Sequence, residues 1–168
     1  MSWKEISIGE LGKVVTGNTP PRKNPEFYGN AYKFIKPTDM DIGNRYTAVT
    51  EDFYSEIAYE KYIKSLIPPL STCVVTIGSI GQKMTLTDNY SFINQAVNAV
   101  IPDIDKFDPF FTFYALKNIL HKVKSADTGA SSGRENVSKS NFMSLKLEVP
   151  INIETQKKIG YVLSHLMI

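Results

Sequence analysis

Several short polar stretches of this sequence carry side chains whose types suit contact with a nucleic acid. Carboxamide and guanidinium groups match the hydrogen-bonding edges of bases in the major groove of DNA, while lysine and hydroxyl groups hold phosphates. Glycines among them let a backbone approach closely. The residues that we single out as candidate DNA contacts on this basis are Lys36, Thr38, Asn44, Arg45, Ser79, Gln82, Lys83, Lys122, Lys124, Ser131, Ser132, Arg134, Asn136 and Lys139.

Within this set, Arg134 and Gln82 are the leading candidates for reading bases. Arginine forks onto guanine and glutamine pairs with adenine, and each such contact contributes about 1–3 kcal/mol of discrimination. Lys122, Lys124 and Lys139 are the candidate phosphate contacts. The competing interpretation is that Arg134 forms a surface salt link and that Gln82 stabilises its own turn.

The composition is that of an ordinary globular domain, with 168 residues, of which 42% are hydrophobic and 21% charged, and a net charge of +2. Residues 39–60 carry a net charge of −5 and residues 117–146 one of +4. The basic stretch suits a phosphate-facing surface or, equally, a solvated face. One cysteine, Cys73, excludes an internal disulfide. Without a signal peptide or a membrane span, we expect a cytoplasmic protein with no membrane partner.

The pattern of apolar residues predicts an α+β, β-rich domain with one core helix. A helix from Ser55 to Lys64 should turn Ile57 and Tyr59–Ile63 inward, and the core helix should begin at Asp108 and Pro109, a capping acid followed by proline. Asn94 and Gln95 interrupt an apolar strand, so we expect them to be structural, and Gly17 and Thr19 should shape a loop. The predicted strands are Tyr32–Lys36, Cys73–Ile77, Met84–Thr87, Phe92–Ile101 and Leu145–Val149.

A last helix is predicted over Glu154–Ile168, and it defines a second segment, 152–168, after a recognition domain at 1–151. Its apolar stripe has helical spacing and consists of Ile159, Val162, Leu163 and Leu166. We expect this helix to leave the domain and to pair with another helix, from a second recognition half, a second copy or another subunit. The alternative is that it folds back on its own domain.

No pattern in the sequence predicts catalysis. Neither of the glycine-rich nucleotide-binding motifs is present, and no serine lies in a G-x-S-x-G turn. His121 and His165 fall on predicted helices without neighbouring metal ligands, so no metal site is expected. The sequence therefore predicts a binding protein with no catalytic residues and no cofactor of its own.

An ordered set of motifs resembles the target recognition domain of type I restriction-modification specificity subunits. The resemblance covers nearly the whole chain, and it rests on the order of the motifs rather than on any one of them. They are Trp3, Ile8–Gly12, Thr16–Pro20, Phe34–Met40, Ile77–Gly81, Asn94–Ala96, Gly129–Arg134, Val149–Ile151 and Glu154–Ile159, the last leading into the family's spacer helix.

This resemblance implies a function in DNA recognition. A full specificity subunit has two such domains, joined by long helices that pair as an antiparallel coiled coil, and each domain reads one half of a bipartite double-stranded DNA site. It scaffolds modification subunits, which methylate adenine with S-adenosylmethionine, and restriction subunits, which use ATP and Mg²⁺. With one domain and the start of a spacer helix, the sequence corresponds to a fragment, a truncated gene product or a half-subunit that dimerises.

Two other functions stay open at this point. One is a protein- or carbohydrate-binding module of the same α+β class, which would not bind duplex DNA at low salt. The other is the recognition domain of a single-chain restriction-methylation enzyme, which would have a catalytic domain encoded upstream in the same reading frame.

Overall fold

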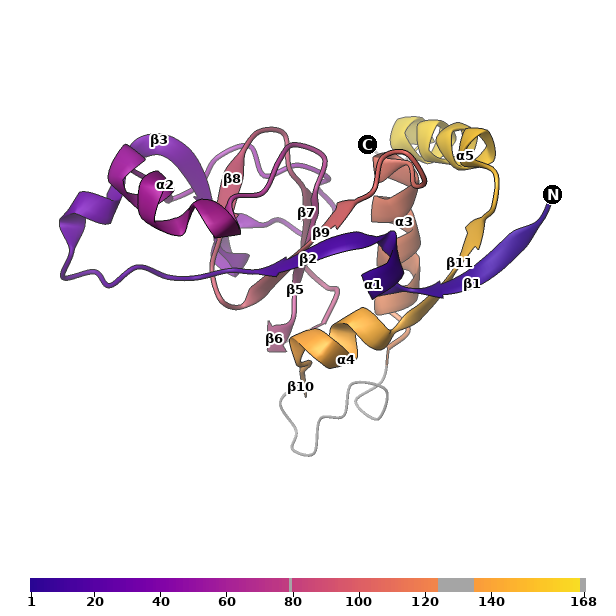
Figure 1. The fold of residues 1–168 in the computed structure, drawn as a ribbon, viewed down its shortest axis with the longest axis horizontal. Helices are drawn as coiled ribbons and strands as arrows, with labels where there is room; N and C mark the ends of the chain where they lie inside the picture. Colours follow the sequence, from indigo (N-terminus) through magenta and orange to yellow (C-terminus); the bar gives the residue numbers. More distant parts are fainter. Residues whose placement is uncertain (79, 124–134, 167–168) are drawn as a thin grey trace.

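A computed structural model describes residues 1–78, 80–123 and 135–166 (Figure 1). In this part of the chain, short strands gather into four sheets and helices pack around them. The mixture of helices and short strands confirms the predicted α+β class. None of the helices described has the length and apolar character needed to cross a membrane.

The central sheet consists of four antiparallel strands and lies inside the molecule. Alternate side chains of a strand point to opposite faces, so Val14 and Val74 join one apolar cluster while Val15 and Val75 join another. The side chains of three of the strands are almost all buried, which explains their β-branched composition. In spatial order the strands are β2 (Gly12–Thr16), β9 (Val97–Pro102), β5 (Thr72–Val75) and β7 (Met84–Leu86).

Three smaller sheets surround this centre. A three-stranded sheet at the left of Figure 1 is covered by α2 (Glu56–Tyr62) through an aromatic cluster, and a ribbon at the right joins the N-terminal strand to the last strand. The strands are β3 (Tyr28–Ile35), β4 (Asp52–Tyr54) and β8 (Ser91–Ile93) at the left, β1 (Trp3–Ser7) and β11 (Lys146–Pro150) at the right, and the pair β6 (Ile77–Gly78) and β10 (Glu135–Asn136). The remaining short helices are α1 (Ile8–Leu11), α4 (Lys139–Ser144) and three 3₁₀ turns at Pro25–Phe27, Pro37–Asp39 and Ile63–Ser65.

Two local predictions need correction. The apolar run over Phe92–Ile101 forms two strands, because the Asn94 side chain accepts a hydrogen bond from the Ala96 amide (3.0 Å) and turns the chain between them. The helix capped by Ser55 is present, but Ile57 and Ile63 do not face inward, since they are 54% and 43% exposed. Ala58 and the neighbouring tyrosines occupy the buried face of α2 instead.

The loop after β2 is held against the connection between β8 and β9. A Cβ atom on Gly17 would lie 2.1 Å from the carbonyl oxygen of Asn94, so only glycine allows this close approach. Thr19 donates a hydrogen bond to the side-chain oxygen of Gln95. These contacts confirm that Gly17 and Thr19 shape the loop and that Asn94 and Gln95 are structural.

The core helix α3 (Pro109–Leu120) begins where the sequence predicts, because the Asp108 carboxylate accepts a hydrogen bond from the Phe111 amide (2.8 Å). The side chain of Gln156, on α5 (Ile153–Leu166), is 1% exposed and accepts a hydrogen bond from the Asp108 amide (3.0 Å). It also donates to the carbonyl of Pro150 (2.9 Å). This one carboxamide therefore fixes the start of α5 to the start of α3.

The apolar stripe of α5 is divided between two environments. Ile159 and Leu163 pack against the core around α3, so for these two residues the folded-back alternative is correct. Val162 and Leu166 are 51% and 75% exposed. The helix therefore leaves only part of its apolar surface for another helix, because its other face covers its own domain.

The close approach of the backbone at Gly17 predicts that the substitution Gly17→Ala strongly destabilises the fold. The added methyl group would collide with backbone carbonyls that cannot move away, so we expect the free energy of unfolding in urea to fall by more than about 2 kcal/mol. Gly9→Ala is the matched control, since its Cβ would lie 3.2 Å from the flexible end of the Met143 side chain and no closer than 3.4 Å to a backbone atom, the Met143 carbonyl oxygen. Equal stability of the two variants would contradict this account of the loop.

Candidate nucleic-acid interface

Loops from separate parts of the chain meet beside the C-terminal end of α3. Asn44, Gln82 and Lys117 line one small depression, so the loop before β4, the turn between β6 and β7, and α3 are neighbours there. A Cβ atom on Gly81 would lie 2.5 Å from the Leu120 side chain, which places that turn directly on the helix.

The turn is flanked on its other side by the segment that precedes α4. Strand β10 pairs with β6, and the side-chain oxygen of Asn136 accepts a hydrogen bond from the Gly78 amide (3.1 Å). In Figure 1 this strand pair lies at the lower end of the molecule, near α4. We call the surface formed by Thr38, Asn44, Gln82, Lys117, Lys122, Asn136 and Lys139 the loop face.

Four predicted contacts on the loop face are exposed and have free polar groups. The side chains of Thr38, Gln82, Lys122 and Lys139 have no hydrogen-bond or ion-pair partner among the described residues, and all four are exposed. Two further carboxamides each use one polar atom in a hydrogen bond within the protein. The Asn136 oxygen accepts a hydrogen bond from the Gly78 amide, and the Asn44 nitrogen donates one to the Asp41 carboxylate (3.2 Å). Free donors and acceptors are what a base edge or a phosphate requires.

Lys36 and Lys83 form contacts within the protein instead. The Lys36 ammonium lies 2.7 Å from a Glu51 oxygen and 2.8 Å from an Asp52 oxygen, and its side chain is only 15% exposed. The Lys83 ammonium donates to the Pro37 carbonyl (2.9 Å). These contacts leave little of either charge for a phosphate.

Arg45 joins three elements of the fold. Its guanidinium donates to the Tyr114 hydroxyl of α3 and to the Ser164 carbonyl of α5, both at 2.9 Å. It also lies over the ring of Tyr46, 5.1 Å from the ring centre. The guanidinium group of Arg45 therefore connects α5 to the domain. The sequence predicts a DNA contact at Arg45, but in the structure the side chain is used for contacts within the protein.

The remaining predicted contacts lie outside the described residues; these are Ser79, Lys124, Ser131, Ser132 and Arg134. In contrast, Lys117 is not among the DNA contacts predicted from the sequence. It nevertheless lines the depression beside Asn44 and Gln82 and forms no ion pair within the described part of the chain. Lys117 opens the basic stretch of the sequence, but most residues of the helix that carries it are apolar.

The acidic segment is partly neutralised within the fold. Arg22 and Lys36 both contact Asp52, at 2.5 Å and 2.8 Å, and they lower the pKa of its carboxyl group from 3.8 to about 2, mainly through the hydrogen bond from Arg22. Among the residues described there is no group of three His, Cys, Asp or Glu side chains that could hold a metal ion. The loop face offers hydrogen-bonding groups and three lysines, with the Asp41 carboxylate also lining the depression.

Comparisons with known proteins agree on one family. All residues, 1–168, match the model of the type I restriction modification DNA specificity domain. The chain is 30% identical over 162 residues to the type I restriction enzyme HindI specificity subunit of Haemophilus influenzae, covering 95% of this chain and 33% of that protein. It is 31% identical over 170 residues to the EcoR124I/EcoR124II specificity subunit of Escherichia coli, covering 97% and 40%. The chain thus spans about a third to two fifths of these relatives.

Solved structures show the same fold at low sequence identity. An S subunit of a type I restriction-modification system from M. genitalium superposes with a TM-score of 0.68 and 18% identity, covering 98% of this chain and 38% of that one. A chain from a study of assembly and conformational transition of the type I R-M system gives a TM-score of 0.74 and 16% identity, covering 98% and 38%.

The ion pairs of Asp52 predict a specific dependence of stability on pH. Because the pKa in the folded state is lower than in the unfolded state, the ionised carboxylate stabilises the fold above about pH 4, and this contribution disappears as the pH falls to about 2. We expect Asp52→Asn to lower the free energy of unfolding by about 1–2 kcal/mol at pH 7, with the difference from wild type vanishing near pH 2.

Urea unfolding at a series of pH values measures this effect. Asp105→Asn is the control, since Asp105 is exposed and forms no ion pair within the described residues, and it should keep the wild-type profile. A constant difference between Asp52→Asn and wild type from pH 7 to pH 2 would show that the ion pairs do not stabilise the fold.

Proposed function

Because the chain belongs to the type I restriction modification DNA specificity domain family, we propose that it recognises one half of a bipartite site in double-stranded DNA. The observation that carries this proposal is the depression of the loop face, where the carboxamides of Asn44 and Gln82 and the ammonium group of Lys117 come together from separate parts of the chain. Each bidentate base contact contributes about 1–3 kcal/mol of discrimination, so a few such groups are enough to read a half-site.

The residues divide into two roles in this proposal. Gln82 and Asn44 present carboxamides to base edges, together with Arg134, Ser131, Ser132 and Ser79. Lys117, Lys122, Lys124 and Lys139 bind phosphates, which position the domain on the duplex without reading its sequence. Lys36, Lys83 and Arg45 support the loops from inside.

The chain acts in this proposal as the non-catalytic recognition component of a cytoplasmic assembly. It has no cofactor of its own and places a modification subunit, which transfers a methyl group from S-adenosylmethionine to adenine, and a restriction subunit, which uses ATP and Mg²⁺. Segment 152–168 begins a spacer helix. The exposed residues Val162 and Leu166 on α5 support pairing with the helix of a second recognition half or a second copy.

Base-resolution mapping of N6-methyladenine tests the function. Cells that express the chain with the modification subunit of its system should show one methylated bipartite motif. Gln82→Ala should relax the preference at one base pair of that motif, because the pair loses its two hydrogen bonds. Asn30→Ala, which removes an exposed carboxamide from β3, should leave the motif unchanged. Formation of the complex without any methylated motif would contradict the proposal.

The division between free and internally paired lysines predicts different salt dependences. Lys122→Ala should lower the slope of log affinity against log salt concentration by about one, because one phosphate contact is lost for all sequences alike. Lys36→Met should lower stability and leave the slope unchanged, since its ammonium is bound to Glu51 and Asp52. Fluorescence anisotropy with a labelled duplex at several salt concentrations measures both, and the reverse pattern would remove Lys122 from the interface.

A further inference from the structure

The core helix α3 is apolar around almost its whole circumference. Its only polar residues are Thr112, which is buried, and Lys117 and Asn118 near its C-terminal end. A helix of this composition is stable only when neighbours cover all its sides. The central sheet, α5 and β11 cover three of them, and the fourth is open.

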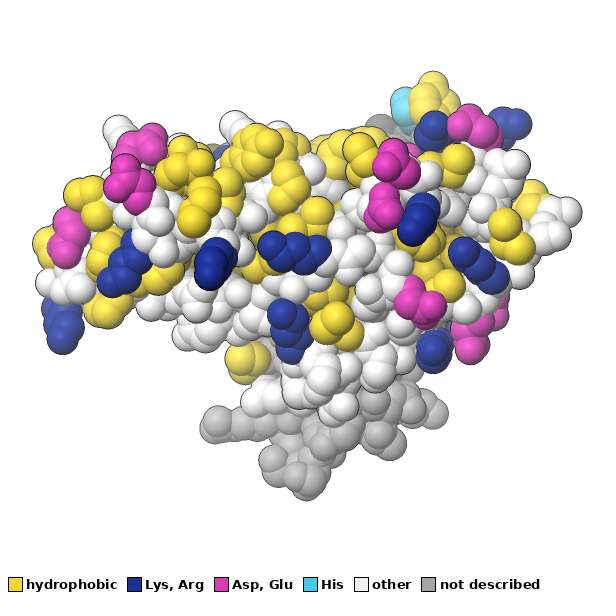
Figure 2. All heavy atoms as spheres, viewed as in Figure 1, with side chains coloured by type: hydrophobic (Ala, Val, Ile, Leu, Met, Phe, Trp, Pro, Cys, Tyr) yellow, Lys and Arg dark blue, Asp and Glu magenta, His cyan; other side chains and the backbone are white. Residues whose placement is uncertain are grey.

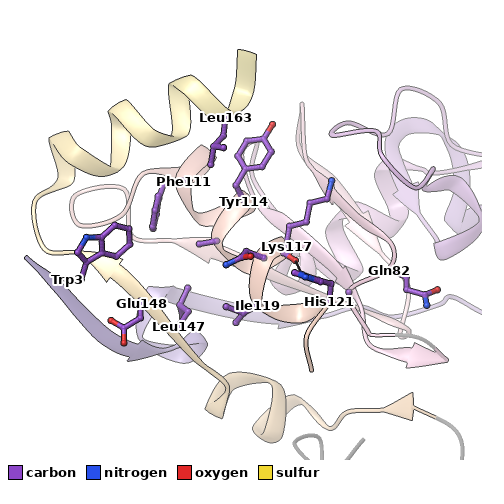
Figure 3. A pocket seen from close by; sticks show the side chains of 13 residues that line it. Trp3, Gln82, Phe111, Tyr114, Lys117, Ile119, His121, Leu147, Glu148 and Leu163 are labelled. Atoms are coloured by element: carbon purple, nitrogen blue, oxygen red, sulfur yellow. Dashed lines mark hydrogen bonds between the residues drawn. The ribbon is translucent and has the colours of Figure 1, made fainter. Parts of the chain in front are cut away.

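The open side forms a trough with α3 as its floor, α5 as one wall and the β1–β11 ribbon as the other (Figure 3). Its volume is about 770 Å³, and Phe111, Ala115, Ile119, Leu147 and Leu163 line it. Trp3, the one tryptophan of the chain, lies at one end with its side chain 46% exposed. Tryptophan is one of the residues that most often contribute strongly to binding at protein interfaces.

The two ends of the trough differ in charge. Lys117 and His121 line the end near Ile119, and a second cavity that shares Ile119 continues there past Lys122 and Lys146. Glu148 lines the trough at the end where Trp3 lies. An α-helix has a complementary polarity, because its C-terminal end is partly negative and its N-terminal end partly positive.

We propose that the trough seats one amphipathic helix of about three turns from the modification subunit, an inference that rests on the proposed function. The helix lies along α3, whose twelve residues extend about 18 Å, and inserts apolar residues spaced i, i+3 or i+4, and i+7. Its C-terminal turn carries acidic residues and lies at the end where His121 and Lys146 are found, two residues that the proposed DNA interface does not use.

The position of the trough favours the modification subunit as the occupant. Gln82 and Lys117 line both the trough and the depression of the loop face, so the trough is continuous with the proposed DNA interface. A helix held there places its own subunit next to the base pairs that this domain reads. A subunit that modifies a base within the recognised site needs that proximity.

Binding of the purified modification subunit to the full chain tests the proposal. Ala115→Gln fills the trough with a polar side chain and retains a good helix former, and Trp3→Ala removes its largest apolar group. We expect each variant to weaken binding of the modification subunit by a factor of about 10 or more, with duplex affinity changed less than about twofold. Ile104→Gln, on a residue that is 70% exposed between β9 and α3, is the matched control and should bind normally.

A second measurement does not depend on the stability of a variant. In the wild-type chain labelled with 5-fluorotryptophan, the ¹⁹F signal reports Trp3 alone. It should shift when the modification subunit is added and stay in place when duplex DNA is added. Normal binding by both trough variants, or an unchanged Trp3 signal in the complex, would overturn the trough as the docking site while leaving DNA recognition intact.

Two further outcomes also contradict the proposal. A Trp3 signal that shifts with the concentration of the chain alone would show that a second copy occupies the trough. Failure of the wild-type chain to bind the modification subunit at all would overturn the proposed function together with this inference, and the methylation map would then show no motif.

Discussion

The need to cover α3 on every side organises the structure. Burying a large apolar side chain stabilises a fold by roughly 1.5–3 kcal/mol, and Phe111, Phe113, Leu116 and Leu120 are all nearly inaccessible. The central sheet, the ribbon of the first and last strands, and α5 all use α3 as their common support. Because the turn at Gly81 packs against Leu120 near the C-terminal end of this helix, the same packing positions the loop face.

The distribution of charge between the two halves of the chain has a physical explanation in the fold. The acidic residues Glu51 and Asp52 lie against Lys36 and Arg22, so part of the negative charge is neutralised locally. The basic residues at the end of α3 and the start of α4 have no such partners within the described residues. Positive charge is therefore left at the loop face, where it attracts a polyanion over several ångströms of solvent.

The sequence predicted those features that depend on neighbouring residues. The start of α3 at Asp108 and Pro109 and the Ser55 cap follow from local chemistry. The sequence also predicts that Gly17 shapes a loop, although it does not predict the tight contact with Asn94. The roles of Lys36 and Arg45 could not be predicted in this way. Asp52 reaches Lys36 only because β3 and β4 pair with Phe34 opposite Asp52, and the partners of Arg45 lie 69 and 119 residues away.

For the same reason, the sequence did not single out Lys117 and did not show that Ile159 and Leu163 of the α5 stripe pack against their own domain. A lysine on an apolar helix becomes a candidate only when another loop folds beside it, as the turn at Gln82 does. Ile159 and Leu163 face inward because Gln156 fixes the direction of α5. Both features depend on tertiary contacts, which cannot be predicted from the spacing of residues along the sequence.

Hydrogen exchange of backbone amides, with and without a duplex carrying the recognised half-site, tests the central claim most directly. If the loop face reads DNA, exchange should slow at residues 37–45, 80–84 and 135–139. It should stay unchanged in α2, at the left end of the molecule in Figure 1, where acidic and basic side chains are mixed (Figure 2). Protection confined to α2 and β4, or no protection at all in a formed complex, would contradict the assignment of the loop face as the DNA interface.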